Sequence, residues 1–101
     1  MVKHVVMFRL KEELELEMKQ QVIETFRKGI LALPATIPFI RAIEVGVNIN
    51  ANETWDICLN SSFDTFEEAC AYGVHPAHVA VASALKPYVM QRSCVDYEVE
   101  K

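Results

Sequence analysis

Apolar residues along the chain follow two spacings, which predict four strands and three helical segments. Alternating apolar and polar positions are typical of a strand with one buried face, and they predict strands at residues 2–10, 40–49, 55–63 and 93–99. A spacing of three to four residues, typical of an amphipathic helix, runs from about Leu14 to Pro34. The buried stripe of this helix is predicted to contain Met18, Val22, Phe26 and Ile30.

Two helix starts follow in the second half of the chain. Residues 65–68 fit a capping box, which predicts a short helix ending near Tyr72. Pro76 suits the first position of a further helix, because the missing N–H has no intrahelical partner there. His75 is then the cap, and Pro87 ends the helix. The apolar members of this last helix are predicted to be Val79, Val81, Ala82 and Leu85.

The element order is therefore β-α-β-β-α-β, a ferredoxin-like α+β fold, and residues 1–101 are expected to form one domain. The helical segments can cover only one face of a sheet of about four strands, whereas the first strand is apolar on both faces. A second copy of the chain would cover the other face. We therefore expect a homodimer in which two sheets face each other in a barrel-like arrangement.

Composition and charge narrow the range of partners. The net charge is -4, and ten Lys and Arg are scattered among fourteen acidic residues, so nucleic acid is not expected as a partner. No apolar run approaches the roughly 20 residues that a membrane helix needs, and the first ten residues do not resemble a signal peptide. We expect a soluble, cytoplasmic protein. Three separated cysteines suggest neither disulfides nor a thiolate metal site, and they are expected to be buried and reduced.

Candidate chemistry is concentrated in residues 72–79, which place a phenol and two imidazoles around the start of the last helix. His78 falls in the first turn, where the positive end of the helix dipole opposes protonation. A neutral imidazole can accept a proton, so His78 beside Tyr72 is a candidate for acid–base chemistry.

Four segments, taken in order, carry a resemblance over nearly the whole chain: residues 3–11, 44–48, 72–79 and 95–97. They resemble the stress-responsive dimeric α/β-barrel family, abbreviated Dabb, and the bacterial form more than the plant stress proteins. The resemblance implies a ferredoxin-like homodimer whose paired sheets enclose a cavity.

Residues 72–79 are also similar to the corresponding segment of the olivetolic acid cyclases, a branch of plant polyketide cyclases. This resemblance implies that Tyr72 and His78 are the catalytic pair and that no cofactor or metal is needed. His78 would remove a proton α to a carbonyl, while Tyr72 donates a hydrogen bond to the developing enolate. The resemblance further implies a cavity lined by His4, Val6, Phe8, Ile23, Phe26 and Asp96. Val89, Arg92 and Cys94 depart from the cyclase, where these positions are larger or more apolar.

Three functions follow as hypotheses. The leading one is a homodimer that binds a small apolar or aromatic molecule in its barrel cavity without proven turnover. The alternative is a cofactor-independent cyclase or isomerase that uses His78 and Tyr72. A third is a monooxygenase like those of antibiotic biosynthesis, for which the sequence has no distinctive residues.

Structural roles remain open for the same side chains. Tyr72 is equally well explained as an aromatic residue packed on the sheet. His78 could cap its own helical turn or bond to Asp96, and His4 on the inner face of a strand is typical of a satisfied core histidine. His75-x-x-His78 also has metal-ligand spacing that His4 or Asp96 would complete, but this signal is weak, and no metal is expected.

Overall fold

A four-stranded antiparallel sheet and three α-helices make up the computed structural model, which describes residues 1–99. Along the chain the elements are β1 (Val2–Leu10), α1 (Leu16–Leu31), β2 (Ala42–Val47), β3 (Ile57–Phe63), α2 (Phe66–Val74), α3 (Pro76–Leu85) and β4 (Val89–Glu98). Single 3₁₀ turns follow α1 at Leu33–Ala35 and α3 at Lys86–Tyr88. The strand order is β2-β3-β1-β4. This confirms the predicted ferredoxin-like α+β fold.

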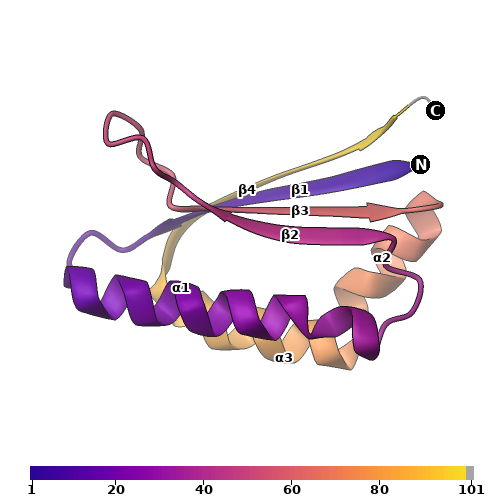
Figure 1. Cartoon of the computed structure of the whole chain (residues 1–101), viewed down its shortest axis with the longest axis horizontal. Coiled ribbons are helices and arrows are strands. Elements are labelled where there is room, and N and C mark those ends of the chain that lie inside the picture. The colour runs from indigo at the N-terminus through magenta and orange to yellow at the C-terminus, as the bar shows by residue number, and fades with distance from the viewer. Residues whose placement is uncertain (100–101) are drawn as a thin grey trace.

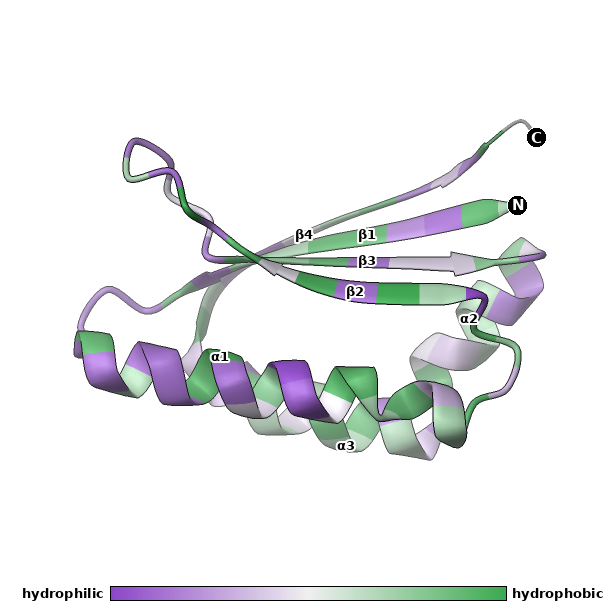
Figure 2. Cartoon of the chain, in the orientation of Figure 1, coloured by the Kyte–Doolittle hydropathy of each residue, from purple (hydrophilic) through white to green (hydrophobic). Residues whose placement is uncertain are grey.

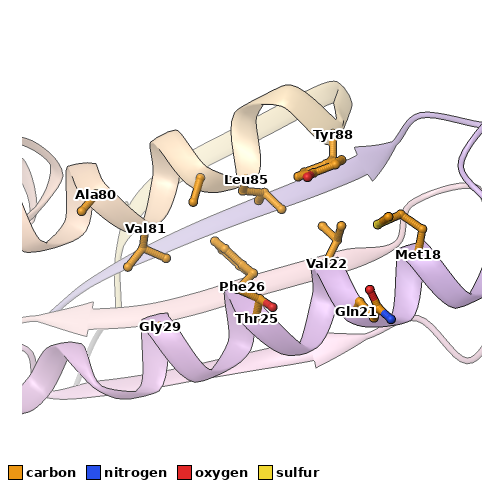
Figure 3. Close-up of a pocket in the computed structure, with 11 residues that line it drawn as sticks. Met18, Gln21, Val22, Thr25, Phe26, Gly29, Ala80, Val81, Leu85 and Tyr88 are labelled. Atoms are coloured by element: carbon orange, nitrogen blue, oxygen red, sulfur yellow. The ribbon is translucent and has the colours of Figure 1, made fainter.

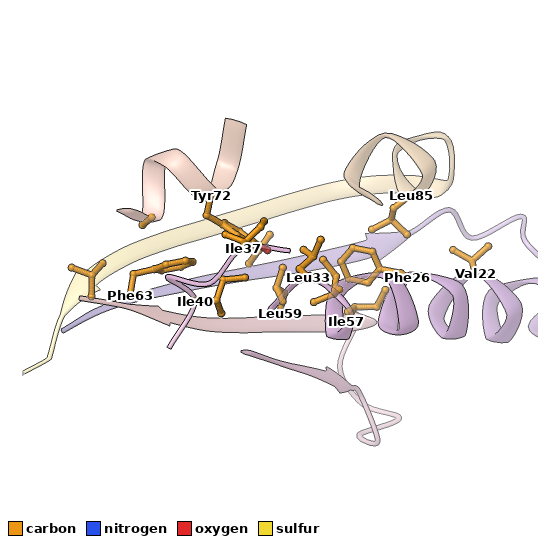
Figure 4. Packing of buried hydrophobic residues seen from close by; sticks show 14 of the residues in the cluster. Val22, Phe26, Leu33, Ile37, Ile40, Ile57, Leu59, Phe63, Tyr72 and Leu85 are labelled. Carbon is orange, nitrogen blue, oxygen red and sulfur yellow. The ribbon is translucent and has the colours of Figure 1, made fainter. Parts of the chain in front are cut away.

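The helices cover one face of the sheet and leave the other face open (Figure 1). Alternation along β1 explains the division, because Val2, Val6 and Leu10 are buried toward the helices, whereas Val5 and Met7 lie on the opposite face. Side chains from the sheet and from α1 interlock in a single core on the helix side (Figure 4). Among residues 1–99, no helix combines the length and apolar character needed to span a membrane.

The helix caps form as predicted from the sequence. Thr65 accepts a hydrogen bond from the Glu68 backbone N–H, while the Glu68 carboxylate accepts one from Asp64, one residue before the cap. The His75 Nδ1 atom accepts a hydrogen bond from the Ala77 N–H at 3.1 Å, so His75 is the cap of α3. The carbonyl of His75 accepts the first helical bond of α3, from Val79. These contacts fix residues 72–79 as a helix–cap–helix corner.

Strand ends and several burial predictions differ from the structure. β4 begins at Val89, four residues before the predicted start, because the turn at Lys86–Tyr88 absorbs Pro87 and leads directly into the strand. β2 and β3 are shorter than predicted at their shared end, where Asn48 and Asn50 side chains bond to the loop backbone instead.

Met18 was predicted to be buried, but it is 41% exposed. Met18 lies at the edge of an open groove between α1 and α3, where nothing covers it (Figure 3). Val79, one of the apolar residues named for the last helix, is 44% exposed. The α3 helix is apolar along most of its length, so its sequence pattern does not select one buried face (Figure 2). The cysteines are free as expected, but Cys70 and Cys94 are exposed. Cys94 lies on the edge strand β4, which has a neighbour on one side only.

Candidate functional site

A pocket of about 520 Å³ lies on the helix side of the sheet, between β1, β4 and α3. We call it the imidazole pocket, because His4 of β1 and His78 of α3 both line it. The remaining lining residues are Val6, Phe8, Phe26, Leu59, Ala82, Ser83, Leu85, Lys86, Val89, Met90, Gln91 and Arg92. Its volume is in the range of small-molecule sites, as is its combination of an apolar wall with a few polar groups.

One wall of the imidazole pocket is aromatic and aliphatic. The rings of Phe8 and Phe26 pack edge to face with centroids 5.4 Å apart. Leu59 of β3 and Val6 of β1 are buried in the floor beside them. This wall offers a ligand an apolar surface and no hydrogen-bonding group.

His78 is held in one tautomer by the helix–cap–helix corner. Its Nδ1 lies 3.0 Å from the Gly73 carbonyl oxygen, and because a carbonyl only accepts, Nδ1 carries the proton. In the neutral ring, Nε2 is then the hydrogen-bond acceptor. Burial lowers the pKa of His78, aided by the nearby charges of His4, Arg92 and His75, although the Gly73 hydrogen bond acts in the opposite direction. His78 is therefore a neutral imidazole able to accept a proton near pH 7.

His4 is anchored in a similar way from the neighbouring strand. Its Nδ1 lies 2.6 Å from the Asp96 carboxylate, and the two residues are direct partners in the β1–β4 register. The carboxylate accepts the Nδ1–H, which again leaves Nε2 as an acceptor in the neutral ring. The alternative in which Asp96 bonds to His78 is wrong, since Asp96 contacts His4 and His78 bonds to Gly73.

Tyr72 lies directly behind the two imidazoles. Its ring centroid is 4.4 Å from that of His78 and 6.0 Å from that of His4. The side chain is fully buried and also packs on Phe63, yet its hydroxyl has no hydrogen-bond partner among residues 1–99. Burial raises the pKa of Tyr72, so the hydroxyl keeps its proton and remains a donor. Tyr72 thus combines a packing role with an unused donor beside His78.

The structure brings five of the predicted site residues into the lining of one pocket: His4, Val6, Phe8, Phe26 and His78. Tyr72 and Asp96 contact the imidazoles of that wall without lining the pocket themselves. Ile23 is not brought to the pocket, and it packs against the core from α1. The location also needs correction. These residues face the helices, so their pocket lies within one chain and not in the space between paired sheets.

The metal-ligand spacing noted for His75 and His78 does not form a ligand group among residues 1–99. His75 uses Nδ1 in its cap, and neither His75 nor His78 belongs to a group of three potential ligands in the part of the chain that the structure describes. A different set of ligand types, His4, Cys94 and Asp96, has ligand atoms within 4.8 Å of one another. However, the His4 and Asp96 atoms already satisfy each other, and burial together with Asp96 raises the pKa of the Cys94 thiol, which favours its protonated form. The contact between His4 and Asp96 is therefore accounted for by their hydrogen bond.

Two other hollows lack this chemistry. A groove of about 520 Å³ runs between α1 and α3 and is walled by residues such as Met18, Val81 and Tyr88, which we call the interhelical groove (Figure 3). A smaller hollow of about 360 Å³ lies by the β2–β3 hairpin, near Trp55. Neither contains a histidine. The imidazole pocket is therefore the candidate functional site.

Lys86 and Arg92 are pocket residues that the sequence analysis did not assign to the cavity. Arg92 was identified only as a departure from the cyclase, and the strand containing it was predicted to begin one residue later. Its alternation with Cys94 and Asp96 could have placed it on the face of His4, because residues two apart share a face.

The fold and the pocket together define a class: small ferredoxin-like α+β proteins with a pocket between the sheet and its helices. Within this class, residues 2–99 match the stress responsive A/B barrel domain (Dabb). The chain belongs to this family, as its sequence resemblance implied. No curated protein sequence matches the chain.

Solved structures agree with this assignment. A dimeric protein of unknown function with a ferredoxin-like fold, from Bacteroides fragilis, is 46% identical, with a TM-score of 0.95 over 97% of this chain and 95% of that one. The hydroxynitrile lyase of Passiflora edulis is 16% identical, with a TM-score of 0.75 over 99% and 94%. A putative antibiotic biosynthesis monooxygenase from Nitrosomonas europaea is 14% identical, with a TM-score of 0.78 over 98% of both chains. At such low identity, the two enzymes support the fold alone.

Proposed function

We propose that this protein is a homodimer that binds a small apolar or aromatic molecule in the imidazole pocket of each subunit. The observation that carries the proposal is the pocket itself, where an apolar wall built on Phe8 and Phe26 faces two anchored imidazoles. Apolar walls supply binding free energy through burial, while a few fixed polar groups orient the ligand.

A pair of substitutions on α3 tests this proposal. Ala82 lines the imidazole pocket, whereas Ala80, two residues earlier, lines the interhelical groove. Ala82→Phe fills the first space and Ala80→Phe the second. With a neutral fluorescent probe such as N-phenyl-1-naphthylamine, we expect Ala82→Phe to weaken binding by at least about tenfold and Ala80→Phe to leave it unchanged, a difference of about 1.4 kcal/mol. Thermal unfolding of both variants checks that they fold. The reverse order of effects would place the ligand between the helices.

The homodimer is proposed from the open face of the sheet. Val95 and Tyr97 of β4 are 54% and 46% exposed there, beside Val5 of β1. Such contiguous apolar surface is typical of an interface, and a second sheet would cover it. The Bacteroides fragilis protein, which is 46% identical over nearly the whole chain, is described as dimeric, and this supports the proposal.

A second candidate function is cofactor-independent proton transfer, as in a polyketide cyclase or isomerase. Two specific observations favour it. The Gly73 hydrogen bond leaves Nε2 of neutral His78 as an acceptor, and the buried Tyr72 hydroxyl beside it has no partner. In such a reaction Nε2 would remove a proton α to a carbonyl, and Tyr72 would donate a hydrogen bond to the enolate oxygen. Because Tyr72 is fully buried, its hydroxyl must become accessible to the substrate first.

His78→Gln tests the proton-transfer hypothesis. The glutamine amide can still donate to the Gly73 carbonyl, but it cannot act as a base at neutral pH. Linear poly-β-ketone thioesters are suitable substrates, and their cyclisation is followed by ultraviolet absorbance. If the wild type accelerates cyclisation, His78→Gln should lower the rate about 10²- to 10⁴-fold, the usual contribution of a general base. An accelerated rate that survives the substitution would rule out His78 as the base.

A further inference from the structure

Positive charge gathers at the imidazole pocket, although the chain as a whole carries a net charge of -4. Lys86 and Arg92 both line the pocket, and no aspartate or glutamate of residues 1–99 does. The two cations come from different elements: Lys86 follows α3, and Arg92 lies on β4. Charge of one sign in a cleft raises the local concentration of ions of the opposite sign. The pocket therefore differs in charge from the rest of the protein.

Neither cation is neutralised by a carboxylate of residues 1–99. Arg9 pairs with Glu12 and Arg41 with Asp64, but Lys86 and Arg92 form no ion pair with any residue that the structure describes. Two unpaired cations beside an apolar wall leave a charge that a ligand can complement.

Asp96 is the nearest carboxylate on the same face of β4, and it forms no ion pair with Arg92, although both side chains lie near the Cys94 thiol. The two residues are four positions apart, which corresponds to about 13 Å along a strand. The Asp96 carboxylate is also engaged by His4 at 2.6 Å. The negative charge that would balance Arg92 is thus absent from the pocket wall.

We propose that the natural ligand is an amphipathic anion, with its apolar body against Phe8 and Phe26 and a carboxylate at Arg92 and Lys86. This inference rests on the proposed binding function and adds the charge of the ligand. A planar guanidinium matches a carboxylate with two parallel hydrogen bonds, and Lys86, which lines the same pocket, adds a point charge. Ligands of this class include aryl-alkanoic, fatty and β-oxo acids.

Two matched probes distinguish the contribution of the ligand's negative charge to binding from the contribution of its apolar body. 4-Phenylbutanoate and its primary amide have the same body, and only the first is charged at pH 7. Isothermal titration calorimetry of both compounds is compared for the wild type, Arg92→Gln, Lys86→Gln and the double variant. Arg27→Gln is the control, because Arg27 is an exposed arginine of α1 that lines none of the three hollows and forms no ion pair with residues 1–99.

We expect the wild type and Arg27→Gln to bind the carboxylate about tenfold more tightly than the amide, which corresponds to one charge-assisted hydrogen-bonded contact. Each pocket substitution should reduce this preference, and the double variant should abolish it while binding the amide as the wild type does. Equal wild-type affinity for the two probes would overturn the anion inference and leave the binding function standing. Failure of both probes to bind the wild type would overturn both proposals.

Discussion

At the scale of single residues, Tyr72 has the most unusual surroundings. A buried hydroxyl without a partner costs about 1–3 kcal/mol, because it loses its hydrogen bonds to water. Tyr72 is fully buried and lies against His78, so this cost falls on a residue next to the candidate base. A ligand or substrate that reached this hydroxyl could accept its hydrogen bond.

Tyr72→Phe removes the unpaired hydroxyl and keeps the ring packing. We expect the free energy of unfolding to stay the same or to rise by up to about 1–3 kcal/mol, measured by urea denaturation. Tyr88→Phe, at a half-buried tyrosine of the interhelical groove, is the control. A loss of more than about 1 kcal/mol in Tyr72→Phe alone would show that the hydroxyl does have a partner in solution.

The pKa of His78 makes a second prediction at this scale. The folded protein lowers this pKa from the usual 6.5, chiefly through burial, with the charges of His4, Arg92 and His75 acting in the same direction. As the pH falls below 6.5, the unfolded chain therefore takes up a proton more readily than the folded one, and stability is lost until the folded pKa is passed. The imidazole ¹H–¹⁵N spectrum should show a titration midpoint below 6.5 for His78. A midpoint above 6.5 would contradict the assigned environment.

At the scale of elements, strands and caps were more predictable than the surface of α3. Alternation fixed β1 to the residue, and Thr65 and His75 act as the predicted caps, because these signals depend on neighbours in sequence. Packing between elements that are far apart in the sequence was harder to predict. The apolar sequence of α3 does not select one face, and Val79, which was named among its apolar residues, is exposed.

The candidate site was likewise predictable only where its signals depend on neighbours in sequence. Residues 72–79 identified His78 and Tyr72 because proline and capping signals are local. The pairing of His4 with Asp96 depends on the register of β1 against β4, and the inclusion of Lys86 depends on the turn before β4. A sequence without a known register cannot supply these contacts.

Close packing of α1 on α3 supports one prediction at this scale. A Cβ atom added at Gly29 would lie 3.1 Å from both γ-methyl groups of Val81, so no single rotation of Val81 relieves the contact. Gly29→Ala should therefore destabilise the protein, although alanine favours a helix over glycine by about 1 kcal/mol.

In a Val81→Ala background, the same Gly29→Ala substitution should be stabilising, because the two methyl groups are gone. A double-mutant cycle of unfolding free energies measures the coupling. Stabilisation by Gly29→Ala in the wild-type background would show that the helices separate easily at this point.

At the scale of the whole molecule, the two faces of the sheet differ in what they contact. The helix side contains the core and the imidazole pocket, whereas the open side carries Val5, Val95 and Tyr97, the surface proposed to contact a second subunit. The pocket is thus formed within one chain, by residues on the helix side of the sheet.

Val95→Glu tests the proposed interface. A carboxylate at position 95, on the open face of β4, would be buried against the partner sheet without a counter-charge, which is costly. We expect light scattering with size-exclusion chromatography to show a dimer for the wild type and a monomer for Val95→Glu. Val79→Glu, on exposed α3, should remain dimeric. A dimer that persists in Val95→Glu would place the interface elsewhere.

The most direct test of the account is to map where a ligand binds, by titrating isotope-labelled protein with 4-phenylbutanoate and following methyl and imidazole signals by NMR. We predict shifts at Val6, Val89 and the rings of His4 and His78, which line the imidazole pocket. The methyl groups of Val5, on the opposite face of the sheet, should stay in place and serve as the internal control. Shifts centred on Val5, or on residues of the interhelical groove such as Met18, would contradict the account.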